Sequence, residues 1–150
     1  MRKTALGRRM PDRLRVFLDA NILFSAALKE SSRFLQFWRM RNAVPMTSWY
    51  VADEAQRNCV NPPHAARLAA LLEQTHIVSD APAAMLPPGI ELAAKDAPVL
   101  AAALLCGADY LITGDTKHFG KWMDIPIETH LGRLLIQEPG RFLDEHLDPL

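Results

Sequence analysis

Short apolar runs alternate along this chain with longer segments whose apolar positions recur at helical spacing. Leu14–Leu18 is a short β-prone run that ends at Asp19, and from Ile22 to Ala27 the apolar residues return three to four positions apart. The pattern predicts a strand, a turn and a helix start, with Asp19 or Asn21 available as the helix cap. Similar patterns predict further strands at 44–47, 76–78, 109–113 and 125–127, and further helices at 31–38, 48–60, 64–73, 97–106 and 129–136.

Strands that alternate with helices predict an α/β fold: a three-layer α/β/α sandwich with a central, mainly parallel sheet. Residues 80–89 contain three prolines and are predicted to form a connecting loop. A chain of 150 residues, of which 49% are hydrophobic, fits one compact domain. We assign this domain to residues 14–150 and interpret residues 1–13 as a loose basic arm.

The formal net charge is zero, but the charges are unevenly distributed. Residues 1–15 contain six Arg or Lys and one acidic residue, whereas residues 138–150 contain four acidic residues and one Arg. A basic arm of this kind can contact phosphate groups, and it can equally be a solvated tail, so both interpretations stay open.

The two cysteines and the apolar runs indicate where the protein works. Cys59 and Cys106 occur without a CxxC motif or a paired Cys/His spacing, so we expect free thiols, a reducing compartment such as the cytoplasm, and no zinc site. The longest uncharged apolar stretch, 97–108, has 12 residues. A membrane helix needs about 20, so we predict no membrane span. No apolar stretch precedes Pro11, which argues against a secretory signal.

Four acidic residues are placed where a parallel α/β sheet would gather them. Asp19 and Asp115 follow predicted strands, Asp96 precedes a helix, and Glu54 lies early in its helix. Ligands bind beyond the carboxyl ends of parallel strands, so this placement suggests a site. Taken alone, Asp19 and Asp96 also suit helix caps, Glu54 a solvated face and Asp115 a turn. These separate explanations do not account for four acids at one edge of the sheet.

A cluster of four carboxylates repels itself unless a cation compensates the charge. Oxygen ligands without Cys or His favour Mg²⁺ or Mn²⁺, which also bind phosphate oxygens. Such ions lower the pKa of a bound water molecule and support phosphodiester hydrolysis. Asn21, Ser25 and Thr113 are available to orient the water or to hydrogen-bond the carboxylates.

Three segments carry a family resemblance: Val16–Ser25, Lys95–Leu104 and Gly107–Phe119, in that order. Together they resemble the PIN-domain family, a nuclease fold named after the N-terminal region of the type IV pilus retraction ATPase, over most of residues 14–136. The resemblance implies a metal-dependent endoribonuclease, in many cases the toxin of a bacterial toxin–antitoxin pair. RNA and an antitoxin protein are therefore the implied partners.

Matched residue by residue, the first, third and fourth family acids fall on Asp19, Asp96 and Asp115, which the resemblance implies to be catalytic metal ligands. The second catalytic acid falls on Glu54, with the adjacent Asp53 as the alternative. One position rotates a side chain by about 100° around a helix, so only one of the two can face the site, and we favour Glu54. Many members carry another acid where this chain has Thr-Lys-His at 116–118, so the number of metal ions stays open.

Several neighbouring residues have two interpretations. Lys117 and His118 are candidate substrate-binding residues, although a solvated lysine and a hydrogen-bonded structural histidine are the competing interpretations. Lys95 has the same two interpretations as Lys117. Stacking on bases is one interpretation of five aromatic residues: Phe34, Phe37, Trp38, Trp49 and Tyr50. The first three recur at helical spacing and suit a core or a dimer face, so a homodimer stays open.

Two other functions are compatible with the sequence. One is a binding module that uses the same fold and carboxylates to dock a basic partner or to hold a structural ion. The other is a phosphatase with Asp19 as nucleophile, but that class usually has a second aspartate two residues on, where this chain has Asn21.

Overall fold

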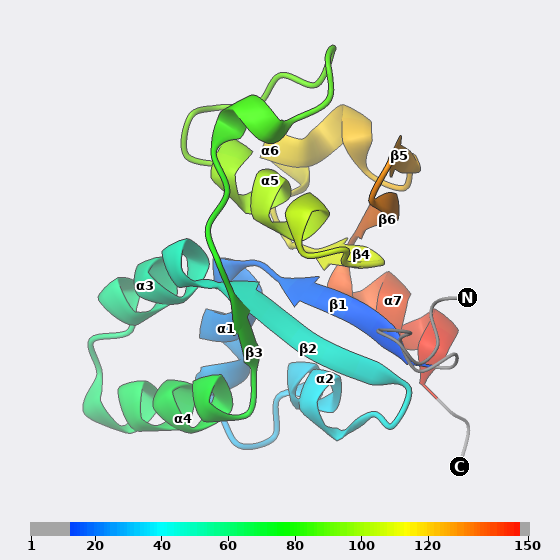
Figure 1. The fold of residues 1–150 in the computed structure, drawn as a ribbon. Coiled ribbons are helices and arrows are strands. Elements are labelled where there is room, and N and C mark those ends of the chain that lie inside the picture. The colour runs from blue at the N-terminus through cyan, green and yellow to red at the C-terminus, as the bar shows by residue number, and fades with distance from the viewer. Residues whose placement is uncertain (1–12, 148–150) are drawn as a thin grey trace.

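The computed structural model describes residues 13–147, which form a six-stranded sheet between helical layers (Figure 1). The order across the sheet is β3-β2-β1-β4-β6-β5, and all neighbours pair in parallel except β5 and β6, which pair antiparallel. The predicted sandwich with a mainly parallel sheet is confirmed. The strands are β1 (Leu14–Leu18), β2 (Ala43–Ser48), β3 (His76–Val78), β4 (Tyr110–Ile112), β5 (Ile127–Thr129) and β6 (Gly132–Gln137).

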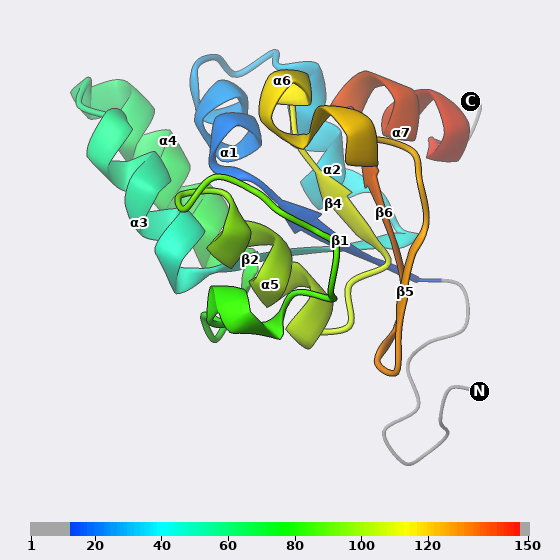
Figure 2. The ribbon, with the colours of Figure 1, turned by 90° about the horizontal axis from the view of Figure 1, so that it is seen from above.

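Helices lie on both faces of this sheet. Viewed from above, α5 covers one face while α1, α2 and α7 lie on the other (Figure 2). The pair α3 and α4 packs beside α1. The α-helices are α1 (Ala20–Ala27), α2 (Gln36–Arg39), α3 (Trp49–Asn58), α4 (Pro62–Glu73), α5 (Ala97–Leu105), α6 (Thr116–Phe119) and α7 (Pro139–His146). Short 3₁₀ turns form η1 (Arg33–Leu35), η2 (Ala83–Met85) and η3 (Gly120–Trp122).

The first strand lies at the centre of the sheet and carries the core. Val16, Phe17 and Leu18 are fully buried, because β1 is covered by helices on both faces. Burying one such side chain contributes about 1.5–3 kcal/mol, so the strand that leads into Asp19 is firmly held. The polar residues that follow β1, beginning with Asp19, are therefore attached to a well-packed strand.

Side-chain caps set several helix starts where the sequence predicts them. Asp19 caps α1, and the Ser48 hydroxyl accepts a hydrogen bond from the backbone N–H of Val51 at the start of α3. Cys59 and Cys106 are free thiols, as expected. In the part of the chain that the structure describes, no helix has the length and apolar character needed to cross a membrane.

The predicted helix at 129–136 is wrong. Residues 127–137 form the β5–β6 hairpin, in which Leu134 and Ile136 are buried on alternate positions while β6 extends the parallel sheet beside β4. Thr129 does use its hydroxyl as a cap, but it accepts from the N–H of Leu131 within the hairpin turn. A threonine that binds the backbone two residues on serves a turn as well as a helix, which explains the error.

The chain end also differs from the prediction. Helix α7 was not predicted, because a Pro-Gly pair at 139–140 is typical of a turn. Proline is equally suited to the first turn of a helix, and Phe142 and Leu143 bury the inner face of α7. The proposed basic arm at 1–13 lies outside the described residues apart from Arg13.

Candidate active site at the carboxyl edge of the sheet

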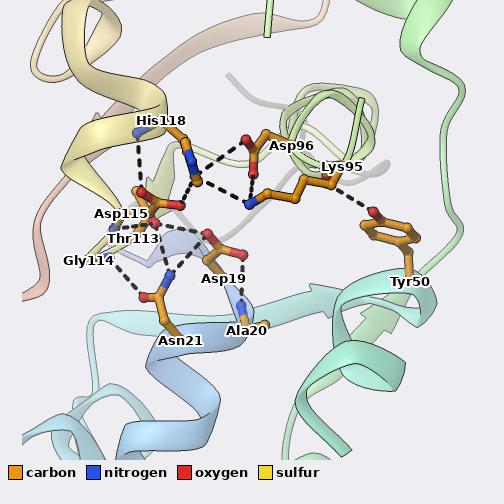
Figure 3. A network of polar contacts seen from close by, with 10 residues as sticks. All are labelled: Asp19, Ala20, Asn21, Tyr50, Lys95, Asp96, Thr113, Gly114, Asp115 and His118. Atoms are coloured by element: carbon orange, nitrogen blue, oxygen red, sulfur yellow. Dashed lines mark hydrogen bonds and ion pairs between the residues drawn. The ribbon is translucent and has the colours of Figure 1, made fainter. Parts of the chain in front are cut away.

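Asp19 lies at the carboxyl end of the central strand and is almost wholly buried, with 7% of its surface exposed. Its Oδ1 accepts a hydrogen bond from the N–H of Ala20 (2.7 Å), and its Oδ2 accepts one from the Thr113 hydroxyl (2.8 Å) (Figure 3). Thr113 follows β4, which pairs with β1 in parallel. Two strands distant in sequence therefore fix the position of this carboxylate.

Asn21 and Thr113 connect Asp19 to the turn after β4. The Asn21 side-chain NH₂ lies 3.3 Å from both Asp19 Oδ2 and Thr113 Oγ1, and its Oδ1 accepts from the N–H of Gly114 (2.8 Å). The Thr113 hydroxyl also accepts from the N–H of Asp115 (3.0 Å). A Cβ at Gly114 would lie 3.3 Å from Asn21 Oδ1, so a glycine allows this close approach.

Asp115 is held by the helix that follows it. Its Oδ1 accepts from the backbone N–H of His118 (3.1 Å), and its Oδ2 lies 2.5 Å from Nδ1 of the His118 ring. The three-residue spacing places both groups on one turn of α6. His118 thus brings a ring nitrogen to the acids, as a hydrogen-bonded histidine whose partner, Asp115, the sequence did not indicate.

Asp96 precedes α5 and is 6% exposed, yet its carboxylate makes no capping hydrogen bond. Its Oδ1 lies 3.5 Å from Lys95 Nζ, and its Oδ2 lies 3.6 Å from His118 Nδ1. Within the described residues, Oδ2 is buried without a hydrogen-bond partner. A buried carboxylate oxygen in this state is costly unless another group binds it.

The two adjacent acids of α3 differ in direction. Glu54 lines the same cavity as the three aspartates, whereas Asp53 pairs with Arg57 (2.9 Å) and has 67% of its side chain exposed. The Tyr50 hydroxyl, also on α3, donates to the backbone carbonyl of Lys95 (2.9 Å) and so ties α3 to the segment that carries Asp96 (Figure 3).

These side chains enclose a cavity of about 420 Å³, which we call the acid cleft. Its lining residues come from α1, α3, α5 and the turns at the ends of β1 and β4. They are Asp19, Ala20, Asn21, Phe24, Glu54, Asn58, Lys95, Asp96, Val99 and Asp115. The four predicted acids thus face one cavity at the carboxyl edge of the sheet.

The surroundings shift the pKa values of Asp19 and Asp115, the two aspartates at strand ends, in opposite directions. Burial raises the pKa of Asp19, and the negative charges of Glu54 and Asp96 raise it further, against hydrogen bonds from Thr113 and Ala20. Burial acts in the same sense on Asp115, but the hydrogen bonds and charge of His118, with the charge of Lys95, outweigh it. The pKa of Asp115 therefore lies below the ordinary aspartate value.

The donor set fits a divalent cation. Ligand atoms of Asp96, Asp115 and His118 all lie within 4.8 Å of one another, and Asp96 Oδ2, which accepts no hydrogen bond within the described residues, lies 3.6 Å from His118 Nδ1. Asp19 faces the acid cleft but is not part of this tight group. Carboxylate oxygens suit Mg²⁺ or Mn²⁺, and an imidazole nitrogen is compatible with Mn²⁺ among other ions.

Two predicted site residues lie elsewhere. Ser25 lines a neighbouring cavity, also of about 420 Å³, which we call the side pocket. Lys117 is exposed on α6 and lines neither cavity. The side pocket is lined by Asn21, Ile22, Ser25, Phe34, Gly114, Asp115 and Pro139.

Four lining residues of the acid cleft were missed in the sequence: Ala20, Phe24, Asn58 and Val99. Asn58 lies four positions after Glu54, and Phe24 lies three positions after Asn21, so each shares a helix face with a predicted site residue. That spacing is the signal that could have identified Asn58 and Phe24.

Comparison with known proteins places this geometry in a family. A family model described as the PIN domain matches residues 15–117, a segment that contains all four acids. No curated protein sequence matches the chain.

Among solved structures, VapBC2 from Rickettsia felis bound to a DNA fragment from its promoter aligns with a TM-score of 0.58 at 15% identity, covering 83% of this chain and 98% of that chain. VapC20 of Mycobacterium tuberculosis, a sarcin–ricin loop cleaving toxin, aligns at 0.48 and 19% identity, covering 67% and 91%. The PIN domain endonuclease Utp24 aligns at 0.43 and 13% identity, covering 80% and 89%. At 15% identity, the likeness to VapBC2 shows the fold alone.

The fold and the family match agree, because both cover the segment that positions the acids. Since the PIN-domain model spans more than half of the sequence, this chain belongs to the PIN-domain family.

Proposed function

We propose that the acid cleft is the active site of a metal-dependent endoribonuclease that hydrolyses RNA phosphodiester bonds. The observation that carries the proposal is the state of Asp96: its buried Oδ2 accepts no hydrogen bond within residues 13–147, and its side chain lines a cavity together with Asp19, Glu54 and Asp115. Four acids at one cavity without enough cations are costly, and a divalent ion with a phosphate substrate removes that cost.

Asp19, Asp96 and Asp115 are the residues that would hold Mg²⁺ or Mn²⁺. The His118 ring is a further candidate ligand, because it lies within the same group of atoms. When bound, such an ion supplies a Lewis acid for a phosphate oxygen and lowers the pKa of a water molecule.

The chain's own groups then have separate tasks. Glu54 reaches the acid cleft from α3 and accepts a proton from the attacking water. Thr113 and Asn21 keep Asp19 in place through their hydrogen bonds. Lys95 brings a positive charge to the acids, and the exposed Lys117 extends that charge outside the cleft toward the RNA backbone.

The family resemblance and the fold shared with VapBC2 favour the toxin of a toxin–antitoxin pair as the biological role. An antitoxin protein and target RNA are the proposed partners, and the cytoplasm is the proposed site of action. Physiology does not follow from fold, so this step needs its own test. Growth arrest on expression, relieved by co-expression of the product of an adjacent small reading frame, would support it.

The catalytic proposal is tested with purified protein and labelled RNA in Mn²⁺. We expect cleavage that stops with EDTA and returns with added metal, and we expect Asp19→Asn to lower the rate by about 100-fold or more. Asp53→Asn is the matched control, since Asp53 points away from the acid cleft and pairs with Arg57. Cleavage that survives EDTA or Asp19→Asn would contradict the proposal, and metal binding without any cleavage would favour a binding module.

A further inference from the structure

The side pocket adjoins the acid cleft and has no role in the reaction proposed for the cleft. It shares Asn21 and Asp115 with the cleft, and we call these two residues the shared ridge. Its remaining walls come from α1, η1, the β4–α6 turn and the start of α7. We propose that the side pocket binds a nucleobase of the RNA strand next to the cleaved phosphate, an inference that rests on the endoribonuclease proposal.

The walls of the side pocket are chemically suited to a base. Phe34 offers a half-buried aromatic ring, with Ile22 and Pro139 as apolar neighbours. Aromatic rings stack on bases of single-stranded nucleic acids, and the pocket volume falls within the range of about 300–1,000 Å³ typical of ligand pockets. In contrast to the acid cleft, where carboxylates predominate, this cavity contains one acidic residue, Asp115, on the shared ridge. A phosphate therefore suits the cleft, with its cation, and a base suits the side pocket.

Packing against other aromatic rings holds the Phe34 ring in place. It packs on the fully buried Phe37 ring (centroids 6.3 Å apart), which in turn packs on Phe142 of α7 (5.7 Å). The ion pair between Arg33 and Asp144 (2.5 Å) also joins η1 to α7. A stacking surface that is already fixed before binding loses little entropy when the base arrives.

Ser25 gives this pocket a polar contact. It lies four residues after Asn21 on α1, and its hydroxyl can both donate and accept a hydrogen bond at a base edge. Asn21 already donates to Asp19 and accepts from Gly114. Ser25 is therefore the residue that we expect to determine which base is preferred, and Phe34 the one that supplies affinity.

The experiment compares an RNA of known cleavage position with versions that carry a single abasic ribonucleotide at each nearby position. For the unchanged protein, we expect one abasic position adjacent to the cleaved bond to lower kcat/KM by about 10-fold, the scale of a lost stacking contact. Phe34→Ala should lower kcat/KM on intact RNA by a similar factor, and the abasic position should then cause no further loss. Phe34→Trp should retain cleavage, and Ser25→Ala should broaden base preference without this loss.

Leu35→Ala is the matched control, because Leu35 belongs to the same 3₁₀ turn but lines a different cavity. Thermal unfolding of each variant checks that the fold is kept. If Phe34→Ala and Leu35→Ala behave alike, or if the Phe34→Ala and abasic losses simply multiply, the base pocket is refuted while the nuclease proposal stands. If Phe34→Ala weakens only antitoxin binding, the side pocket is a protein-binding site and the inference is wrong. If the unchanged protein cleaves no RNA, both proposals fail.

Discussion

On the β1 side of the acid cleft, Asp19 is buried among hydrogen-bond donors, whereas on the β4 side Asp115 is partly exposed beside a histidine ring and a lysine. Two aspartates that line the same cavity thus have opposite environments. The pKa of Asp19 is raised, chiefly by burial, and that of Asp115 is lowered, because the hydrogen bonds and charge of His118, with the charge of Lys95, outweigh burial.

The contrast shows where the charge of the site is compensated. On the β4 side the protein itself supplies polar partners, because Lys95 Nζ lies 3.5 Å from Asp96 and the His118 ring lies 2.5 Å from Asp115. Asp19 has hydrogen-bond donors but no side-chain ion pair among residues 13–147. A bound cation would therefore be stabilised most at a position close to both Asp19 and the acids of the β4 side.

Among the variants that test the difference between the two sides of the acid cleft, Glu54→Gln is expected to have the largest effect on the cleavage rate. Glu54 is one of two acids whose charge raises the pKa of Asp19, and we propose that it accepts a proton from water. Its removal should lower the cleavage rate by about 100-fold, within the range of general acid–base catalysis, although it relieves repulsion around Asp19. The rate of RNA cleavage in Mn²⁺ measures this effect.

The adjacent Asp53→Asn provides the control for that measurement. Asp53 is exposed and its pair with Arg57 contributes only about 0.3–0.5 kcal/mol, so cleavage should stay within about 2-fold of the unchanged protein. Equal losses for both variants would mean that α3 presents neither acid selectively to the acid cleft.

Thr113→Val tests the link between the two sides. The Thr113 hydroxyl donates to Asp19 and accepts from the N–H of Asp115, and it is fully buried. Valine has a similar shape but removes both hydrogen bonds, which leaves the N–H of Asp115 without this partner and Asp19 Oδ2 with Asn21 alone. This change should cost about 1–3 kcal/mol of unfolding free energy. Because Asp19 also loses its orientation, cleavage should fall by about 10–100-fold.

Chemical denaturation and cleavage rates together check this prediction. Thr113→Ser retains the hydroxyl and should stay close to the unchanged protein in both measurements. Loss of stability in Thr113→Val without loss of cleavage would show that the two sides act independently.

Much of this site could be predicted because its residues occur at strand ends. Asp19 and Asp115 follow β1 and β4, and parallel pairing brings such ends to the same edge. The choice of Glu54 over Asp53 followed from family resemblance, and the side chains do point in different directions.

The contact of His118 could not be predicted in the same way. It depends on the four-residue helix α6, which no apolar periodicity marks, and on a loop that brings Asp96 across from another segment. For β6, the run Leu134–Ile136 has no clear period, and the partner strand that decides its conformation lies more than twenty residues earlier in the chain.

The smallest expected effect is a difference between Asp19 and Asp115 in the pH dependence of the unfolding free energy, measured in EDTA. The folded-state pKa of Asp19 lies above the ordinary value of 3.8, so the folded protein binds this proton more tightly than the unfolded chain. The contribution of Asp19 to the unfolding free energy is therefore lost as pH rises from 3.8 through its folded pKa. Asp115 has a lowered pKa, so its contribution is present above 3.8 and is lost as pH falls through its folded pKa.

The two asparagine variants should consequently diverge as the pH increases. Above pH 3.8, Asp19→Asn should gain stability relative to the unchanged protein, because it removes a buried charge, whereas Asp115→Asn should lose stability, because it removes the partner of His118. Denaturation midpoints from pH 3.5 to pH 7 measure both differences. Parallel curves for the two variants would mean that the cleft surrounds both aspartates with equivalent charge. In that case the reason for placing the uncompensated charge at Asp19 would be lost.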